Sequence, residues 1–129
     1  MTIETDVQML ALTPADFQQA GAGVTLVLGR LSKVPSNEWI TCFGRALKES
    51  KNELLRGADV RLEREKIRYL TNASVAKHAQ EGVVATIVAA NEIARQANEK
   101  SERDWAAAQD RAAKDKADFE EVKRKLAGA

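Results

Sequence analysis

The chain has 129 residues, with 20 Lys and Arg against 19 Asp and Glu, one cysteine and one histidine. A single cysteine excludes an intramolecular disulfide and fits a reducing compartment, and so few soft ligands argue against a structural zinc site. The net charge of +1 is lower than the strongly basic charge that is typical of nucleic-acid-binding proteins. The longest apolar stretch, residues 83–90, is too short to span a bilayer, and the acidic Glu4 and Asp6 oppose a signal peptide. We therefore expect a cytoplasmic protein without a membrane segment.

The first 31 residues are predicted to form two strands with a short helical segment between them. Residues 3–12 alternate with a period of two, which favours a half-buried strand. Residues 13–16, Thr-Pro-Ala-Asp, combine an N-cap, a proline at the first helical position and an early acid, so we expect one or two helical turns ending at Gly21. Residues 24–31 carry apolar side chains on both sides, which predicts a central strand with both faces covered.

A helix is predicted from Ser36, its N-cap, to a stop at Gly57, with Glu38 near its positive end. Its apolar residues recur at helical spacing: Trp39, Ile40, Phe43, Ala46, Leu47 and Leu54. Gly44 lies inside this helix at a cost of about 1 kcal/mol relative to alanine. We expect a close approach to the sheet to be the reason for this glycine.

Residues 58–71 are predicted to form a β-hairpin about Arg64 and Glu65. Its apolar residues then share the core face and its charged residues the other face. The expected cross-strand pairs are Glu63 with Lys66, Leu62 with Ile67, Arg61 with Arg68, and Val60 with Tyr69. A four-residue loop is an alternative to the two-residue turn, because no Asn-Gly signal is present.

A long helix follows, capped by Thr71 and Asn72, and its first part carries a wide apolar stripe that should lie on the sheet. Gly82 is expected to kink this helix or to split it. From Val83 to Ala127 there is no Gly or Pro, and past Ala97 the composition becomes strongly charged. Ion pairs four residues apart support the helix there: Glu99 with Arg103, Asp110 with Lys114, Glu120 with Arg124, and Glu121 with Lys125.

Two rows with a seven-residue step run along this helix. The first is Val84, Asn91, Asn98, Trp105, Ala112, Phe119 and Leu126, and the second is Ile87, Ala94, Ser101, Ala108, Asp115 and Val122. Rows of this kind form the seams of helices that pack on other helices. We therefore predict a partner-binding set within them: Trp105, Ala108, Ala112, Phe119, Val122 and Leu126, here named the aromatic stripe. The polar seam residues imply a weak coiled coil, a mixed bundle or packing on a partner's surface, and a solitary solvated helix is the plain alternative.

The hairpin offers a second candidate surface, the hairpin cluster of Arg61, Arg64, Lys66 and Arg68. Like charges directly across two strands are unfavourable unless an anion lies between them, so this cluster could contact a phosphate backbone or an acidic protein. The alternative is local neutralisation by Asp59, Glu63 and Glu65, and the face lacks the interleaved aromatics of single-strand binders.

No catalytic, metal-binding or cofactor-binding motif is apparent. Cys42 and His78 could formally make a nucleophile–base pair, but Cys42 lies on an amphipathic helix and is better explained as a buried thiol. The Gly21-Ala22-Gly23 triplet precedes a strand, whereas a phosphate-binding loop follows a strand and opens a helix. We therefore expect that the protein is not an enzyme.

Together these patterns predict an α+β fold with about four mostly antiparallel strands packed by two helices. The C-terminal helix is expected to be very long and to project as a coiled-coil-like rod. Residues 1–95 should form a small domain and residues 96–129 a charged, heptad-patterned extension. The predicted function is a small adaptor, a protein–protein interaction or assembly module that uses its long helix to bind a protein partner or to self-associate as a homo-oligomer. The alternative is a small nucleic-acid-associated protein that uses the basic hairpin of residues 58–71.

Overall fold

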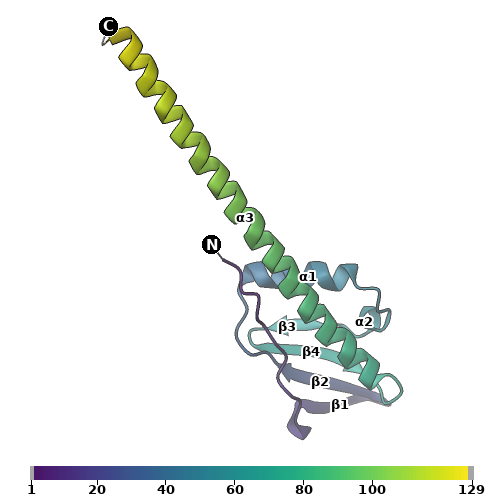
Figure 1. Ribbon diagram of the computed structural model, residues 1–129. Coiled ribbons are helices and arrows are strands. Elements are labelled where there is room, and N and C mark those ends of the chain that lie inside the picture. The colour runs from purple at the N-terminus through teal and green to yellow at the C-terminus, as the bar shows by residue number, and fades with distance from the viewer. Residues whose placement is uncertain (1, 128–129) are drawn as a thin grey trace. The chain divides into compact units, whose positions relative to one another are not determined.

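The computed structural model describes residues 2–127 and shows an antiparallel four-stranded sheet with strand order β1-β2-β4-β3 (Figure 1). The elements in chain order are a 3₁₀ turn η1 (Pro14–Asp16), β1 (Phe17–Gly21), β2 (Val24–Arg30), α1 (Asn37–Glu49), α2 (Leu54–Gly57), β3 (Arg61–Glu63), β4 (Lys66–Thr71) and the very long α3 (Ala76–Ala127). The predicted α+β class is confirmed.

Contacts within the chain group it into two compact units, Met1–Gln96 and Ala97–Ala129. Residues 1, 128 and 129, which the predicted domain bounds include, lie outside the described residues. The first unit holds the sheet, α1, α2 and the beginning of α3. All described residues of the second unit are helical. That the N-terminal part folds as a domain without this extension stays a prediction.

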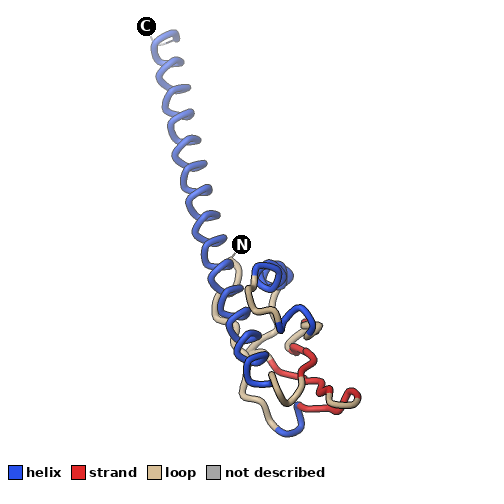
Figure 2. Tube along the Cα trace, turned by 90° about the vertical axis from the view of Figure 1, so that its right-hand side faces the viewer, coloured by secondary structure: helices blue, strands red, loops and turns tan. Residues whose placement is uncertain are grey.

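The core of the first unit lies between the sheet and helices on one of its sides (Figure 2). Ile67 and Tyr69 of β4 are buried on this side, as is Val27 of the neighbouring β2. From α1, Trp39 and Phe43 enter the core with stacked rings whose centroids are 5.6 Å apart. From α3 come small and β-branched side chains at helical spacing: Ala79, Val83, Ile87, Ala90 and Ala94. Burial of each large apolar side chain contributes about 1.5–3 kcal/mol, so this layer provides most of the stability.

One hydrogen-bonded bridge ties three separate segments of this core together. The fully buried Trp39 donates its indole Nε1–H to Oδ1 of Asn91 on α3, at 2.8 Å. The Nδ2 of Asn91 donates to the backbone carbonyl of Val7, also at 2.8 Å. The single Asn91 amide therefore satisfies a donor on α1 and an acceptor in the N-terminal segment.

The predicted strand at residues 3–12 is wrong. The segment is extended, but its only strand-like pairing among the described residues is the isolated bridge of Met9 with Leu31. Two backbone hydrogen bonds flank the bridge, from Leu10 N to Arg30 O and from Ser32 N to Gln8 O. The alternation nevertheless corresponds to burial, because the side chain of Val7 is part of the core. The alternating burial arises here because an extended segment is held against the core by one bridge, and not because the segment is part of a sheet.

The predicted helix at residues 13–21 is also wrong beyond its first turn. Thr13 and Asp16 form a capping box, with Thr13 N donating to Asp16 Oδ2 at 2.7 Å, but the turn ends at Asp16. The chain then enters β1 and returns through Gly21 and Gly23, whose positive φ values of 151° and 73° favour glycine. The capping signal was correct, and the pairing of β1 with β2 overrode the continuation of the helix.

The prediction that both faces of the second strand are covered is corrected by the structure. Its Val27 and Gly29 face the core, whereas Val24 is exposed and Leu26 and Leu28 are only half-buried on the opposite face. Gly29 has a steric reason: an added Cβ would lie 2.8 Å from Met9 Cε and 3.0 Å from Ile67 Cγ2. The glycine thus lets the N-terminal segment approach the sheet.

The hairpin prediction is confirmed in register and turn. β3 and β4 pair Arg61 with Arg68, Leu62 with Ile67, and Glu63 with Lys66. Arg64 adopts a positive φ of 55° in the two-residue turn, a conformation that Asn or Gly more commonly provides. The β3 ladder begins at Arg61, so the expected pair of Val60 with Tyr69 lies outside it.

The predicted helix of residues 36–57 is interrupted in the structure. Ser36 caps α1 as expected, accepting from Trp39 N at 3.2 Å, and Glu4 also binds the Ser36 hydroxyl and backbone N–H. The helix ends at Glu49 because the side chains of Ser50 and Asn52 take the next backbone donors. Gly57 ends the separate short helix α2.

The two helical glycines have opposite surroundings. The space around Gly44 is open, with nothing within 4 Å of an added Cβ, so the expected close approach to the sheet is wrong. Gly82 is buried, and an added Cβ would overlap the side-chain amide of Asn52 and meet Leu55 Cδ2 at 3.3 Å. α3 is not split at Gly82; the glycine admits the α1–α2 loop to the helix surface. α3 begins at Ala76, after a turn in which Asn72 Oδ1 accepts from Ser74 N.

Alanine at these two glycines should therefore change stability in opposite directions. Gly44→Ala is expected to raise the free energy of unfolding by up to about 1 kcal/mol, since it gains helix propensity at no steric cost. Gly82→Ala is expected to lower it by about 1–3 kcal/mol, because Asn52 is held by its own capping bond and cannot move freely. Urea denaturation of both variants measures the difference, and equal effects of the two changes would contradict this account.

Replacement of Asn91 should be costly although the residue is polar. Asn91→Ala leaves the buried Trp39 N–H and the Val7 carbonyl without their partner, so we expect a loss of about 1–3 kcal/mol in the free energy of unfolding. Gln80→Ala, an exposed amide on the same helix, is the matched control and should change stability by less than about 0.5 kcal/mol. Similar losses in both variants would argue against the bridge.

Deletion of residues 100–129 should leave a cooperatively folding domain. All described residues from 100 to 127 are exposed, so their removal uncovers none of the core. The truncated protein is expected to lose helical circular dichroism but to keep nearly the same melting temperature. An unfolded fragment would show that these residues belong to the folding unit.

Candidate interaction surfaces

The aromatic stripe lies entirely within the helical residues 97–127. Its large side chains are exposed over much of their surface: Trp105 by 67%, Phe119 by 64%, Val122 by 55% and Leu126 by 80%. Because residues seven apart share one side of a helix, Trp105, Ala112 and Phe119 follow one line, with Ala108 and Val122 beside it. The two rings are about 21 Å apart along the helix, at about 1.5 Å per residue. This is an apolar surface with large anchors and small alanine positions between them.

The same heptad rows behave differently earlier in α3. Ile87 and Ala94 are buried in the core of the first unit, and Asn91 forms the bridge to Trp39. These seam positions therefore serve the fold of their own chain and are not available to a partner. A periodic row of apolar residues indicates that one face of a helix is buried, but it does not identify the protein segment that buries it.

Charged side chains surround the stripe in the second unit. Lys123 Nζ lies 5.8 Å from the centroid of the Phe119 ring. The predicted pair of Glu121 with Lys125 is present at 2.9 Å, while Glu120 lies 3.9 Å from Lys123. Exposed pairs of this kind are worth a few tenths of a kcal/mol, so they support the helix without fixing a partner.

The hairpin cluster is present on the face of the sheet opposite the core. Arg61 and Arg68 are cross-strand neighbours, Lys66 follows on β4, and Arg64 lies in the turn. Each of the two facing arginines has an acidic neighbour in the chain: Arg61 Nε lies 3.1 Å from Asp59 Oδ1, and Arg68 Nη1 lies 3.4 Å from Glu63 Oε1. This is the local neutralisation that the sequence left open, and it weakens the case for an anion site.

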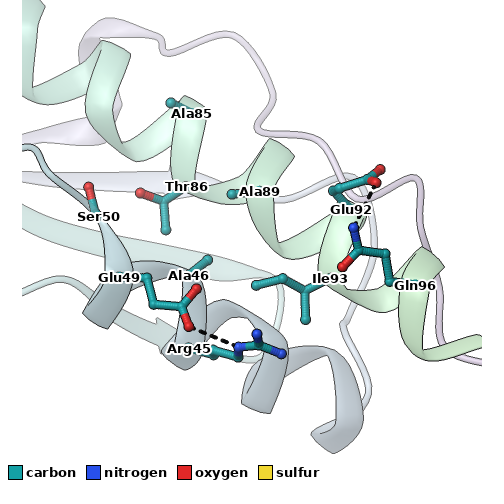
Figure 3. A pocket seen from close by; sticks show the side chains of 10 residues that line it. All are labelled: Arg45, Ala46, Glu49, Ser50, Ala85, Thr86, Ala89, Glu92, Ile93 and Gln96. Carbon is teal, nitrogen blue, oxygen red and sulfur yellow. Dashed lines mark hydrogen bonds and ion pairs between the residues drawn. The ribbon is translucent and has the colours of Figure 1, made fainter.

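A groove of about 470 Å³ lies between α1 and α3 within the first unit (Figure 3). Small side chains such as Ala46 and Ala89 line it, and Arg45 pairs with Glu49 on the α1 side at 3.1 Å. On the α3 rim, a hydrogen bond from Arg95 holds the pKa of Glu92 below its usual range. These polar groups are occupied with one another. No pattern in the sequence predicts this groove, because it forms where two helices that are distant in the sequence come together.

The surroundings of Cys42 and His78, the candidate nucleophile and base, do not activate either residue for catalysis. Cys42 is buried on α1, and burial raises the pKa of its thiol, so the reactive thiolate is disfavoured. His78 is exposed on α3, with its Nδ1 3.8 Å from Glu81 Oε2. Within residues 2–127 no group of three or more His, Cys, Asp or Glu side chains could hold a metal ion. None of the helices in that part of the chain is both long enough and apolar enough to cross a membrane.

Comparisons with protein-family models, with curated proteins and with solved structures found no match to this chain. The function of this chain must therefore be inferred from its own surfaces.

Proposed function

We propose that this protein is a cytoplasmic, non-enzymatic assembly module that binds protein through the aromatic stripe of α3. The observation that carries the proposal is the exposure of Trp105 and Phe119 on one line of a charged helix. Large aromatic side chains on a helix rich in Lys, Glu and Asp are expensive to leave in water, and such residues are typical anchors of interfaces.

The energetics favour a modest interface. Burial of one such aromatic side chain contributes on the order of 2–3 kcal/mol, whereas the alanines of the stripe contribute little beyond close approach. Val122 and Leu126 add apolar surface near the end of the helix. The surrounding charges adjust orientation and specificity more than strength. An interface of this type suits a small adaptor.

The alternative, a nucleic-acid-associated protein that uses the basic hairpin of residues 58–71, has weaker support. Arg61 is exposed and lies directly across from the half-buried Arg68, which favours it. Their ion pairs with Asp59 and Glu63 reduce the net positive charge that a phosphate backbone would meet. A salt-titrated binding assay with DNA and RNA separates this function from the assembly function.

The double variant Trp105→Ala with Phe119→Ala should abolish association at micromolar concentrations, because both anchors are lost. Light scattering of the full chain at two concentrations measures this. The matched control is Asp110→Ala with Lys114→Ala, which removes two side chains about 140° and 180° around the helix from Trp105 and leaves the net charge unchanged. Association that persists in the aromatic variant would contradict the proposed function.

A further inference from the structure

We propose that the aromatic stripe binds the stripe of a second copy of this chain, with the two helices antiparallel and Trp105 of one copy level with Val122 of the other. This inference rests on the proposed function and adds to it the partner, the orientation and the register. It is carried by the charges that flank the stripe in residues 97–127, together with the sizes of the stripe residues.

Charged and polar residues flank the stripe on both sides at seven-residue steps. One flank consists of Asp104, Arg111, Asp118 and Lys125, and the other of Glu102, Gln109, Lys116 and Lys123. All eight are exposed. In a parallel helix pair each flank faces the opposite flank of the partner, whereas in an antiparallel pair each flank faces its own counterpart. The charge order along the flanks therefore distinguishes the two orientations.

The antiparallel register joins opposite charges on both flanks. The nearest cross-helix neighbours are Asp104 with Lys125 of the second copy, Arg111 with Asp118 of the second copy, and Glu102 with Lys123 of the second copy. Each pair occurs twice, because a two-fold axis relates the copies. None of the nearest flank neighbours has like charge, and Gln109 beside Lys116 is neutral.

Most of these charges have no competing partner in their own chain. Within residues 2–127, no ion pair is formed by Glu102, Asp104, Arg111 or Asp118. Lys123 and Lys125 lie near Glu120 and Glu121 on the outer side of the helix. Those exposed contacts are weak, so both lysines can bind a second copy as well.

A parallel pair of helices that uses the same seam would place like charges next to one another. Arg111 would then face Lys116 of the second copy on both flanks, and Asp115 would face its own counterpart within the seam. Only Asp118 with Lys123 would attract. Like charges placed together suppress the wrong arrangement more effectively than matched charges strengthen the right one.

Antiparallel registers shifted by one heptad are opposed in the same way. A shift in one direction brings Asp104 to Asp118 of the second copy and Arg111 to its own counterpart. A shift in the other direction brings Arg111 to Lys125 and places Phe119 opposite Asp115. The charge order therefore selects one register among the antiparallel ones.

Side-chain size agrees with this register. Trp105 packs opposite Val122 of the second copy, and Phe119 opposite Ala108, so each ring has a smaller residue across from it. Asp115 lies opposite Ala112, whose methyl group is small enough to leave the carboxylate access to water. The small positions of the stripe thus acquire a role as the sockets for the large ones.

Disulfide trapping tests the orientation in the full chain. Ser101→Cys and Leu126→Cys are made as two separate proteins, each in a Cys42→Ala background that serves as the control without any thiol. Ser101 of one copy is level with Leu126 of the other, so only the mixture should form a disulfide-linked dimer on mild oxidation. Cross-linking of each protein with itself would indicate a parallel pair and overturn the proposal, as would the absence of any mixed dimer.

Charge reversal tests the register independently. Glu102→Lys should weaken association about tenfold, because two attractive pairs become repulsive, and the added change Lys123→Glu should restore it to within about threefold. In a parallel pair Lys123→Glu would instead face Asp118 and deepen the loss. Failure of the rescue overturns this inference alone. Association that no longer depends on Trp105 and Phe119 would overturn the proposed function as well.

Discussion

The fold of the first unit depends on how a buried indole is accommodated. Trp39 has no exposed surface, and its N–H must find an acceptor in a core that is mostly apolar. Asn91 supplies that acceptor from α3 and uses its own amide to hold the carbonyl of Val7. Asn91, with four hydrogen-bonding sites on one side chain, therefore helps to set the rotation of α3 over α1 and the path of the N-terminal segment. Hydrophobic burial provides the stability here, while this bridge provides the unique arrangement.

α3 carries one periodic pattern that has different surroundings in its two parts. Near its start the pattern supplies Ile87 and Ala94 to the core of its own chain, and past Ala97 it continues as a surface with large exposed rings. A helix with charged residues all around needs no apolar stripe to remain soluble, so the persistence of the stripe favours assembly as its purpose. In the proposed pair, the flanking charges restrict the arrangement, because like charges oppose the parallel pair and the antiparallel registers shifted by one heptad.

The side chains that could take part in chemistry are constrained by their immediate neighbours. The Cys42 thiol is buried and held in its protonated form, and the polar groups around the groove between α1 and α3 bind one another. The hairpin places Arg61 and Arg68 together, but Asp59 and Glu63 accompany them. These carboxylates lower the net positive charge that a phosphate or an anionic substrate would meet there.

The sequence by itself determined the features that depend on neighbours along the chain. These are the Ser36 cap, the hairpin register about Arg64, the continuity of the last helix from Val83 onward and the heptad order of its charges. Local geometry and period decide such features. The tertiary structure alone decided that residues 3–12 form no strand, that Asn91 belongs to the core and that Gly82, unlike Gly44, is sterically required. Each of these depends on a contact between segments far apart in the sequence, and a pattern within one segment carries no information about what lies across from it.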